Sequence, residues 1–104
     1  MNSLIWNLRG IGNTSTVFRL KQLIQRNNIC LVAVFELMID VGRLMNMCLQ
    51  LGFDCACSNI NSNIWIFWKD ELQCSIVQND EQCISVNCNH GLVDGDFFSF
   101  CCVR

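Results

Sequence analysis

The spacing of apolar and polar positions predicts two strand–helix units in the first half of the chain. Leu4–Leu8 is a short apolar stretch before a Gly-containing turn, which is typical of a buried strand. In Thr14–Asn27, apolar residues recur every three or four positions, which predicts a helix with one buried face. Ile29–Phe35 is apolar without a break, which favours a strand buried on both faces. A second helix is expected over Asp40–Leu51, capped at its first residue and ended by Gly52.

The second half of the chain has the pattern of a strand meander with polar turns. The expected strands are "FDCACS" (53–58), "IWIFW" (64–68), "CSIV" (74–77), "CISVNC" (83–88) and "FFSFCCV" (97–103), and the expected turns are "NINSN", "KDEL", "QNDEQ" and "NHGLVDGD". The order β-α-β-α followed by a meander predicts an α/β (α+β) layered fold with both helices on one face of the first sheet. We expect one thin meander to leave apolar faces uncovered, so that residues 1–104 form a single, truncated domain.

Composition limits the possible partners. The chain has 104 residues, 52% hydrophobic and 15% charged, against about 25% charged in average soluble domains. The net charge is −2 and the seven basic residues are scattered along the chain, so there is no electrostatic case for tight nucleic-acid binding. The apolar stretch Ile29–Ile39 is too short to span a bilayer and contains Glu36, so no membrane partner is expected. No signal peptide precedes the nine Cys, which predicts reduced thiols and an intracellular location, nuclear or cytoplasmic.

The cysteines and the single histidine do not form a recognisable zinc motif. There is no C-x-x-C pair, and Cys88 with His90 is the only close Cys/His combination. We therefore expect no zinc and interpret most Cys as small core residues, although a Cys-based metal-binding module remains an alternative. The turn "RGIGN" lacks the phosphate-binding glycine patterns, and His90 in a polar turn is expected to be exposed and idle.

Asn7 and Glu36 are the candidate site residues that the pattern itself indicates. Each follows the apolar part of a predicted strand, and sites of open α/β sheets collect at the carboxyl ends of strands. If the two strands are parallel neighbours, the two residues lie close, and a carboxylate with an amide oxygen suits Mg²⁺. Each also has a simpler interpretation, Asn7 as a turn residue and Glu36 as a solvated one.

The order of several segments resembles a known family. "LIWNLRGIGN", "RLKQLIQRNN", "ICLVAVFEL", "LGFD" and "NIWIFWKDELQCSIV" follow one another along essentially the whole chain. This order resembles the start of the endonuclease domain of plant LINE-type retrotransposons, a member of the endonuclease/exonuclease/phosphatase superfamily. The resemblance implies a two-sheet α/β sandwich that cleaves phosphodiester bonds of DNA with Mg²⁺. It also implies that Asn7 organises metal and phosphate and that Glu36 binds the metal, which acts as a Lewis acid.

The chain also departs from the family pattern at several positions. Met38 stands where the family has a Lys, the chain has no Pro, and Cys102 aligns with a Tyr that contacts phosphate. A thiol cannot donate a hydrogen bond as a phenol does. The family's downstream Asp and Asn and its Asp-His pair have no counterpart in these 104 residues. The resemblance therefore implies the first half of a nuclease domain with a vestigial site (Asn7, Glu36), weak DNA binding and little activity alone.

Two further functions stay open from the residues. The low charge and unmatched apolar strands favour a non-catalytic protein-interaction module, whose partner is a missing C-terminal half or another protein. The Cys-based metal-binding module is the other alternative.

Overall fold

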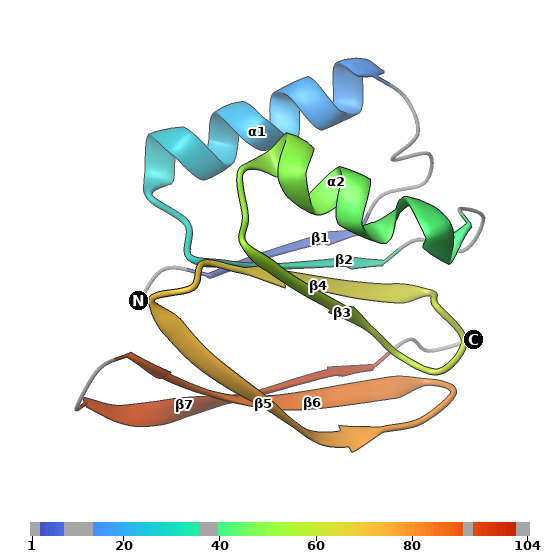
Figure 1. Cartoon of the computed structure of the whole chain (residues 1–104), viewed down its shortest axis with the longest axis vertical. Helices are drawn as coiled ribbons and strands as arrows, with labels where there is room; N and C mark the ends of the chain where they lie inside the picture. The colour runs from blue at the N-terminus through green and yellow to red at the C-terminus, as the bar shows by residue number, and fades with distance from the viewer. Residues whose placement is uncertain (1–2, 8–13, 36–39, 91–92, 102–104) are drawn as a thin grey trace.

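In the computed structural model, residues 3–7, 14–35, 40–90 and 93–101 are described, and they form two helices and two β-sheets (Figure 1). The first half contains β1 (Ser3–Asn7), α1 (Thr14–Asn27), β2 (Leu31–Phe35), the 3-10 turn η1 (Val41–Arg43) and α2 (Leu44–Leu51). The second half contains β3 (Cys55–Ser58), β4 (Ile64–Trp68), β5 (Leu72–Asn79), β6 (Cys83–His90) and β7 (Val93–Cys101). The chain is thus a mixed α/β protein, compatible with the predicted α+β class.

The first sheet has the strand order β1-β2-β4-β3 and carries both helices on one face (Figure 1). β1 and β2 are parallel, and β4 runs antiparallel to its neighbours β2 and β3. Each helix therefore connects two strands of the same direction, and both connections advance across the sheet in the same sense. Crossovers of one hand then put both helices on one face, which confirms the prediction.

The second sheet, β5-β6-β7, is an antiparallel meander that lies against the other face of the first sheet (Figure 1). Alternate side chains of β2 and β4 point into different layers. Val32, Val34, Trp65 and Phe67 pack with the helices, whereas Leu31, Ala33, Ile64 and Ile66 pack with the second sheet. All of these side chains are 0% exposed. The predicted burial of both strand faces is confirmed, but the expectation that the meander leaves them uncovered is wrong, because β5–β7 covers the second face.

The second predicted helix begins later than expected. The Asp40 carboxylate accepts a hydrogen bond from the Gly42 amide (3.1 Å) and its carbonyl accepts one from Arg43, which closes the 3-10 turn before α2. Gly52 ends α2 as predicted, with a φ of 84°. The amide of Phe53 then donates to the Cys48 carbonyl over 2.9 Å, which is the pattern of a Schellman cap.

The strands of the second sheet are longer than predicted. β6 and β7 pair up to His90 and Val93, so most of the expected turn "NHGLVDGD" is strand and His90 ends a strand. Polar residues are tolerated there because an antiparallel sheet can present one face to water. Gln73, Ser75 and Asn87 are exposed in this sheet. Neither helix among the described residues is long and apolar enough to cross a membrane.

Candidate functional site: the carboxyl edge of the first sheet

The carboxyl ends of β1 and β2 lie side by side, as the predicted metal site requires. Asn7, the last residue of β1, pairs in parallel register with Phe35, the last residue of β2. Phe35 also pairs with Ile64 at the start of β4, so the β3–β4 connection begins at this same edge. Figure 1 shows these ends on one side of the molecule, together with the turn between β5 and β6. We call this region the carboxyl edge.

The sequence-predicted site residues are only partly visible at this edge. Asn7 ends β1, so its predicted place at a strand end next to β2 is confirmed at the level of the backbone. Glu36 follows Phe35 in the chain but lies outside the described residues, as does Cys102. The pairing of Asn7 with Phe35 nevertheless puts the backbone that leads into Glu36 next to the end of β1.

A buried asparagine pair organises the part of the carboxyl edge that belongs to β3 and β4. Asn59 is only 2% exposed, and its Oδ1 accepts hydrogen bonds from the amides of Asn63 and Ile64, both at 3.0 Å. Its Nδ2 donates to the Asn63 Oδ1 at 2.6 Å and to the Glu81 carbonyl at 3.2 Å. The Asn59 side chain thus holds its own loop and fastens that loop to the β5–β6 turn.

The β5–β6 turn is shaped by Asp80. Its Oδ1 accepts hydrogen bonds from the amides of Gln82 (2.9 Å) and Cys83 (2.7 Å), and its Oδ2 accepts one from the Gln78 side chain. These bonds lower the pKa of the Asp80 carboxyl, the amide of Gln82 contributing most. Asp80 thus acts as a turn residue, because its Oδ1 holds the two amides that close the β5–β6 turn.

The residue pattern of the segment does not distinguish the buried Asn59 from an ordinary turn residue. "NINSN" reads as an ordinary turn, because Asn in a turn is common whether it is exposed or buried. The only local signal was its position directly before "IWIFW", a strand that must be buried on both faces. A loop attached to such a strand has backbone amides to satisfy away from water.

Several thiols lie between the two sheets. Cys74 and Cys88 are directly opposite in the β5–β6 ladder, and Cys57 packs against the same core. Burial, with the nearby Cys88, raises the pKa of Cys57 to about 11, and burial also raises the pKa of Cys74, helped by a hydrogen bond with Cys88. These thiols behave as protonated core side chains. No group of three or more His, Cys, Asp or Glu side chains in the described part of the chain is placed to hold a metal ion.

One thiol differs from the expectation. Cys83, at the start of β6, is disulfide-bonded, so the prediction of a fully reduced set is wrong at this residue. The physical reason is that the first residue of β6 lies in an antiparallel ladder, where strands bring side chains within a few ångströms of each other. Sequence spacing does not reveal such a contact.

Comparison of the chain with models of protein families, with curated protein sequences and with solved structures gave no match. The assignment of a function therefore depends on the residues and their arrangement.

Proposed function

We propose that this chain is a retrotransposon-derived, endonuclease-like domain of the endonuclease/exonuclease/phosphatase type that carries the first part of a Mg²⁺-dependent site and does not cleave DNA by itself. The observation that carries the proposal is the parallel register of β1 and β2, in which Asn7 pairs with Phe35, the residue before Glu36. The order of segments that resembles the plant LINE-type endonucleases gives independent support.

The layered arrangement is compatible with such a domain. Two sheets pack face to face, with the helices on the outer face of one, and strand ends gather at one edge (Figure 1). In the proposed site the Glu36 carboxylate and the Asn7 amide oxygen supply hard oxygen ligands of the kind that Mg²⁺ prefers, with phosphate and water completing the shell. The metal supplies Lewis-acid polarisation of the phosphate.

The expected lack of activity follows from what these residues cannot supply. Neither Asn7 nor Glu36 is placed by the resemblance as the general base, and general-base catalysis contributes on the order of 10²–10⁴-fold. The position of the phosphate-contacting Tyr is occupied by Cys102. DNA is thus the proposed ligand class, an intracellular compartment the proposed location, and a second half or protein partner the proposed requirement for cleavage.

A metal-binding measurement tests the site separately from cleavage. We expect Mn²⁺, used as a paramagnetic substitute for Mg²⁺, to broaden the backbone amide NMR signals of Asn7 and Phe35 selectively. The broadening should disappear in Glu36→Ala and persist in Asp70→Asn, which removes an exposed carboxylate elsewhere. Broadening that is unchanged in Glu36→Ala would show that the carboxyl edge is not a metal site.

A nicking assay tests the proposed inactivity. Supercoiled plasmid incubated with the chain and Mg²⁺ should be nicked no faster than with Glu36→Ala. Mg²⁺-dependent nicking that Glu36→Ala abolishes would refute the claim that the chain does not cleave DNA alone.

A non-catalytic interaction module is the second candidate, and one surface feature favours it. Met45 and Leu49 lie one turn apart on α2 and are 51% and 70% exposed. Adjacent exposed apolar side chains of this kind mark surfaces that associate with other proteins. If this surface binds a partner, Met45→Lys with Leu49→Lys should lower the binding of a hydrophobic dye such as ANS and leave the folded circular dichroism spectrum intact. Unchanged dye binding would argue against this candidate.

A further inference from the structure

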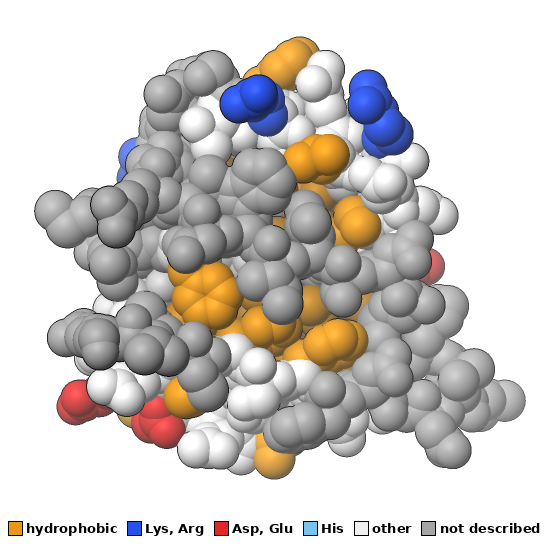
Figure 2. All heavy atoms as spheres, turned by 180° about the vertical axis from the view of Figure 1, so that it is seen from behind, with side chains coloured by type: hydrophobic (Ala, Val, Ile, Leu, Met, Phe, Trp, Pro, Cys, Tyr) orange, Lys and Arg blue, Asp and Glu red, His pale blue; other side chains and the backbone are white. Residues whose placement is uncertain are grey.

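The basic residues are scattered along the sequence, but positive and negative charges are divided between two parts of the chain, residues 1–35 and residues 36–104. Residues 1–35 contain four Lys or Arg and no Asp or Glu, a net charge of +4, whereas residues 36–104 carry a net charge of −6. Three of those four basic residues, Arg19, Lys21 and Arg26, belong to α1. Figure 2 shows Lys and Arg at the top, the side of the molecule where the helices lie, and Asp and Glu lower down. A net charge of −2 for the whole chain therefore hides a basic helix.

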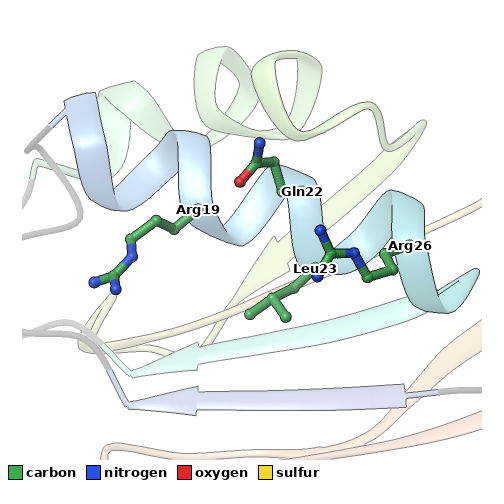
Figure 3. A pocket seen from close by; sticks show the side chains of 4 residues that line it. All are labelled: Arg19, Gln22, Leu23 and Arg26. Carbon is green, nitrogen blue, oxygen red and sulfur yellow. The ribbon is translucent and has the colours of Figure 1, made fainter.

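Two of these arginines border a cavity beside α1. Arg19, Gln22, Leu23 and Arg26 line this cavity, whose volume is about 330 Å³ (Figure 3). These positions recur every three or four residues, so they share one side of the helix. The two arginines are seven positions apart, or roughly 10 Å along the axis. Neither guanidinium has a hydrogen-bond or carboxylate partner among the described residues.

An exposed aromatic side chain lies beside the cavity. Phe18 is 61% exposed, and it is four positions before Gln22, hence on the same side of α1. The buried side of the helix, by contrast, is formed by Leu20 and Ile24. An exposed Phe next to two guanidiniums that pair with no described residue is the combination that single-stranded nucleic acids need, since phosphates pair with the cations and a base stacks on the ring. A polyanion without rings, such as polyglutamate, offers charges to the two arginines but nothing to stack on Phe18.

We propose that the α1 face formed by Phe18, Arg19, Gln22 and Arg26 binds single-stranded nucleic acid, with the two arginines on phosphates and Phe18 stacked on a base. Gln22, between the arginines, can donate to or accept from a base edge, and Leu23 forms an apolar wall of the cavity. The cavity is at the small end of ligand pockets, with room for a single nucleotide unit and not for a duplex. This site is separate from Asn7 and Glu36, and it needs neither a metal nor the proposed cleavage chemistry.

The test measures fluorescence anisotropy of a 5′-fluorescein-labelled (dT)12 with the full chain in EDTA. Two phosphate contacts give a salt slope of about −1.4, so the affinity should fall about sevenfold between 50 and 200 mM KCl. Arg19→Gln with Arg26→Gln should abolish this salt-dependent binding, and the Arg→Lys pair should keep the slope. Phe18→Ala should weaken binding at least about fivefold without changing the slope.

Matched controls locate the site. Lys21→Gln removes one charge from the same helix but from another side, and we expect it to change the affinity less than about twofold. Glu36→Ala should bind (dT)12 with the affinity of the unmodified chain. The metal-site proposal and the α1 proposal can therefore fail independently of each other. Circular dichroism spectra verify that each variant is folded.

Four outcomes would overturn the proposal. The first is no binding at 50 mM KCl, and the second is equal binding by the Arg19→Gln, Arg26→Gln variant. The third is duplex DNA that binds as tightly as (dT)12. The fourth is that polyglutamate competes as well as unlabelled (dT)12 and that Phe18→Ala binds (dT)12 with unchanged affinity. The α1 face would then bind polyanions in general.

Discussion

The side chain of Asn59 provides the sharpest test of the packing at the carboxyl edge. In Asn59→Ala, the amides of Asn63 and Ile64 lose the acceptor that each now has at 3.0 Å. Asn63 is 5% exposed and Ile64 0%, so water cannot easily replace that acceptor. A buried donor left without a partner costs roughly 1–3 kcal/mol. We therefore expect the free energy of unfolding to fall by about 2–4 kcal/mol, a large part of the roughly 5–15 kcal/mol typical of a domain.

Urea denaturation followed by circular dichroism measures this loss. With a slope of about 1–3 kcal/mol per molar urea, the midpoint should fall by on the order of 1–2 M. Asn61→Ala is the matched control, because Asn61 is exposed and its side chain donates a hydrogen bond to the same Glu81 carbonyl, at 3.2 Å. It should cost less than about 0.5 kcal/mol. Equal losses in the two variants would refute the idea that the buried bonds of Asn59 stabilise the fold.

Asn59→Asp extends the test to pH. The substitution keeps an acceptor for the two amides but turns the Nδ2 donor into an oxygen that faces the Asn63 Oδ1 and the Glu81 carbonyl. Burial and these oxygens should raise the folded-state pKa of the new carboxyl above its unfolded value of about 3.9. Stability is then best below that unfolded value and is lost as the pH rises through the folded pKa. A variant whose deficit relative to the unmodified chain does not grow with pH would contradict this assignment.

Three further predictions concern a helix end, a turn and a thiol. Gly52→Ala should lower the free energy of unfolding by about 1–2 kcal/mol because of the positive φ of 84°, which a melting curve can detect. The hydrogen bond from the Gln82 amide is the main cause that lowers the pKa of Asp80 in the folded chain. The carboxylate therefore stabilises the fold above its unfolded pKa, and this stabilisation is lost as the pH falls through the folded pKa. In Asp80→Asn, the free energy of unfolding should depend less on pH in the acid range. Burial and the nearby Cys88 raise the pKa of Cys57 to about 11. At pH 8, iodoacetamide should therefore alkylate Cys57 roughly 100-fold more slowly than a thiol of ordinary pKa, as measured by mass spectrometry.

Periodicity alone predicted the elements whose burial is one-sided or complete. The expected bounds of Thr14–Asn27 match α1, because its apolar stripe continues to the last turn. Ile64–Trp68 matches β4, because an unbroken apolar run leaves few alternatives. The pattern did not reveal that the meander covers the second face of β2 and β4. The sequence of one strand indicates that the strand is buried, but which segment covers it depends on contacts between residues far apart in the chain.

The sequence predicted the candidate site only where a site residue lies at the end of a predicted strand. Asn7 was correctly placed beside the end of β2, because parallel neighbours align their carboxyl ends. The Asn59 network was missed, since a buried Asn and an exposed Asn look alike in a turn-forming segment. The basic helix was missed for a different reason. The net charge of the whole chain does not show that residues 1–35 contain no Asp or Glu.

The strand order β1-β2-β4-β3 also has a consequence for how the chain folds. β4 pairs with β3 across a short loop, and β5, β6 and β7 pair with their sequence neighbours, so these contacts can form early. β2 must wait for the β3–β4 hairpin to close against it, with Leu31 paired to Trp68. During synthesis from the N-terminus, the most hydrophobic strand of the chain therefore emerges well before the strand that covers its edge. We expect nascent chains that extend no further than α2 to need chaperone protection. This need should end only when β5–β7, which cover the second face of β2 and β4, have also left the ribosome.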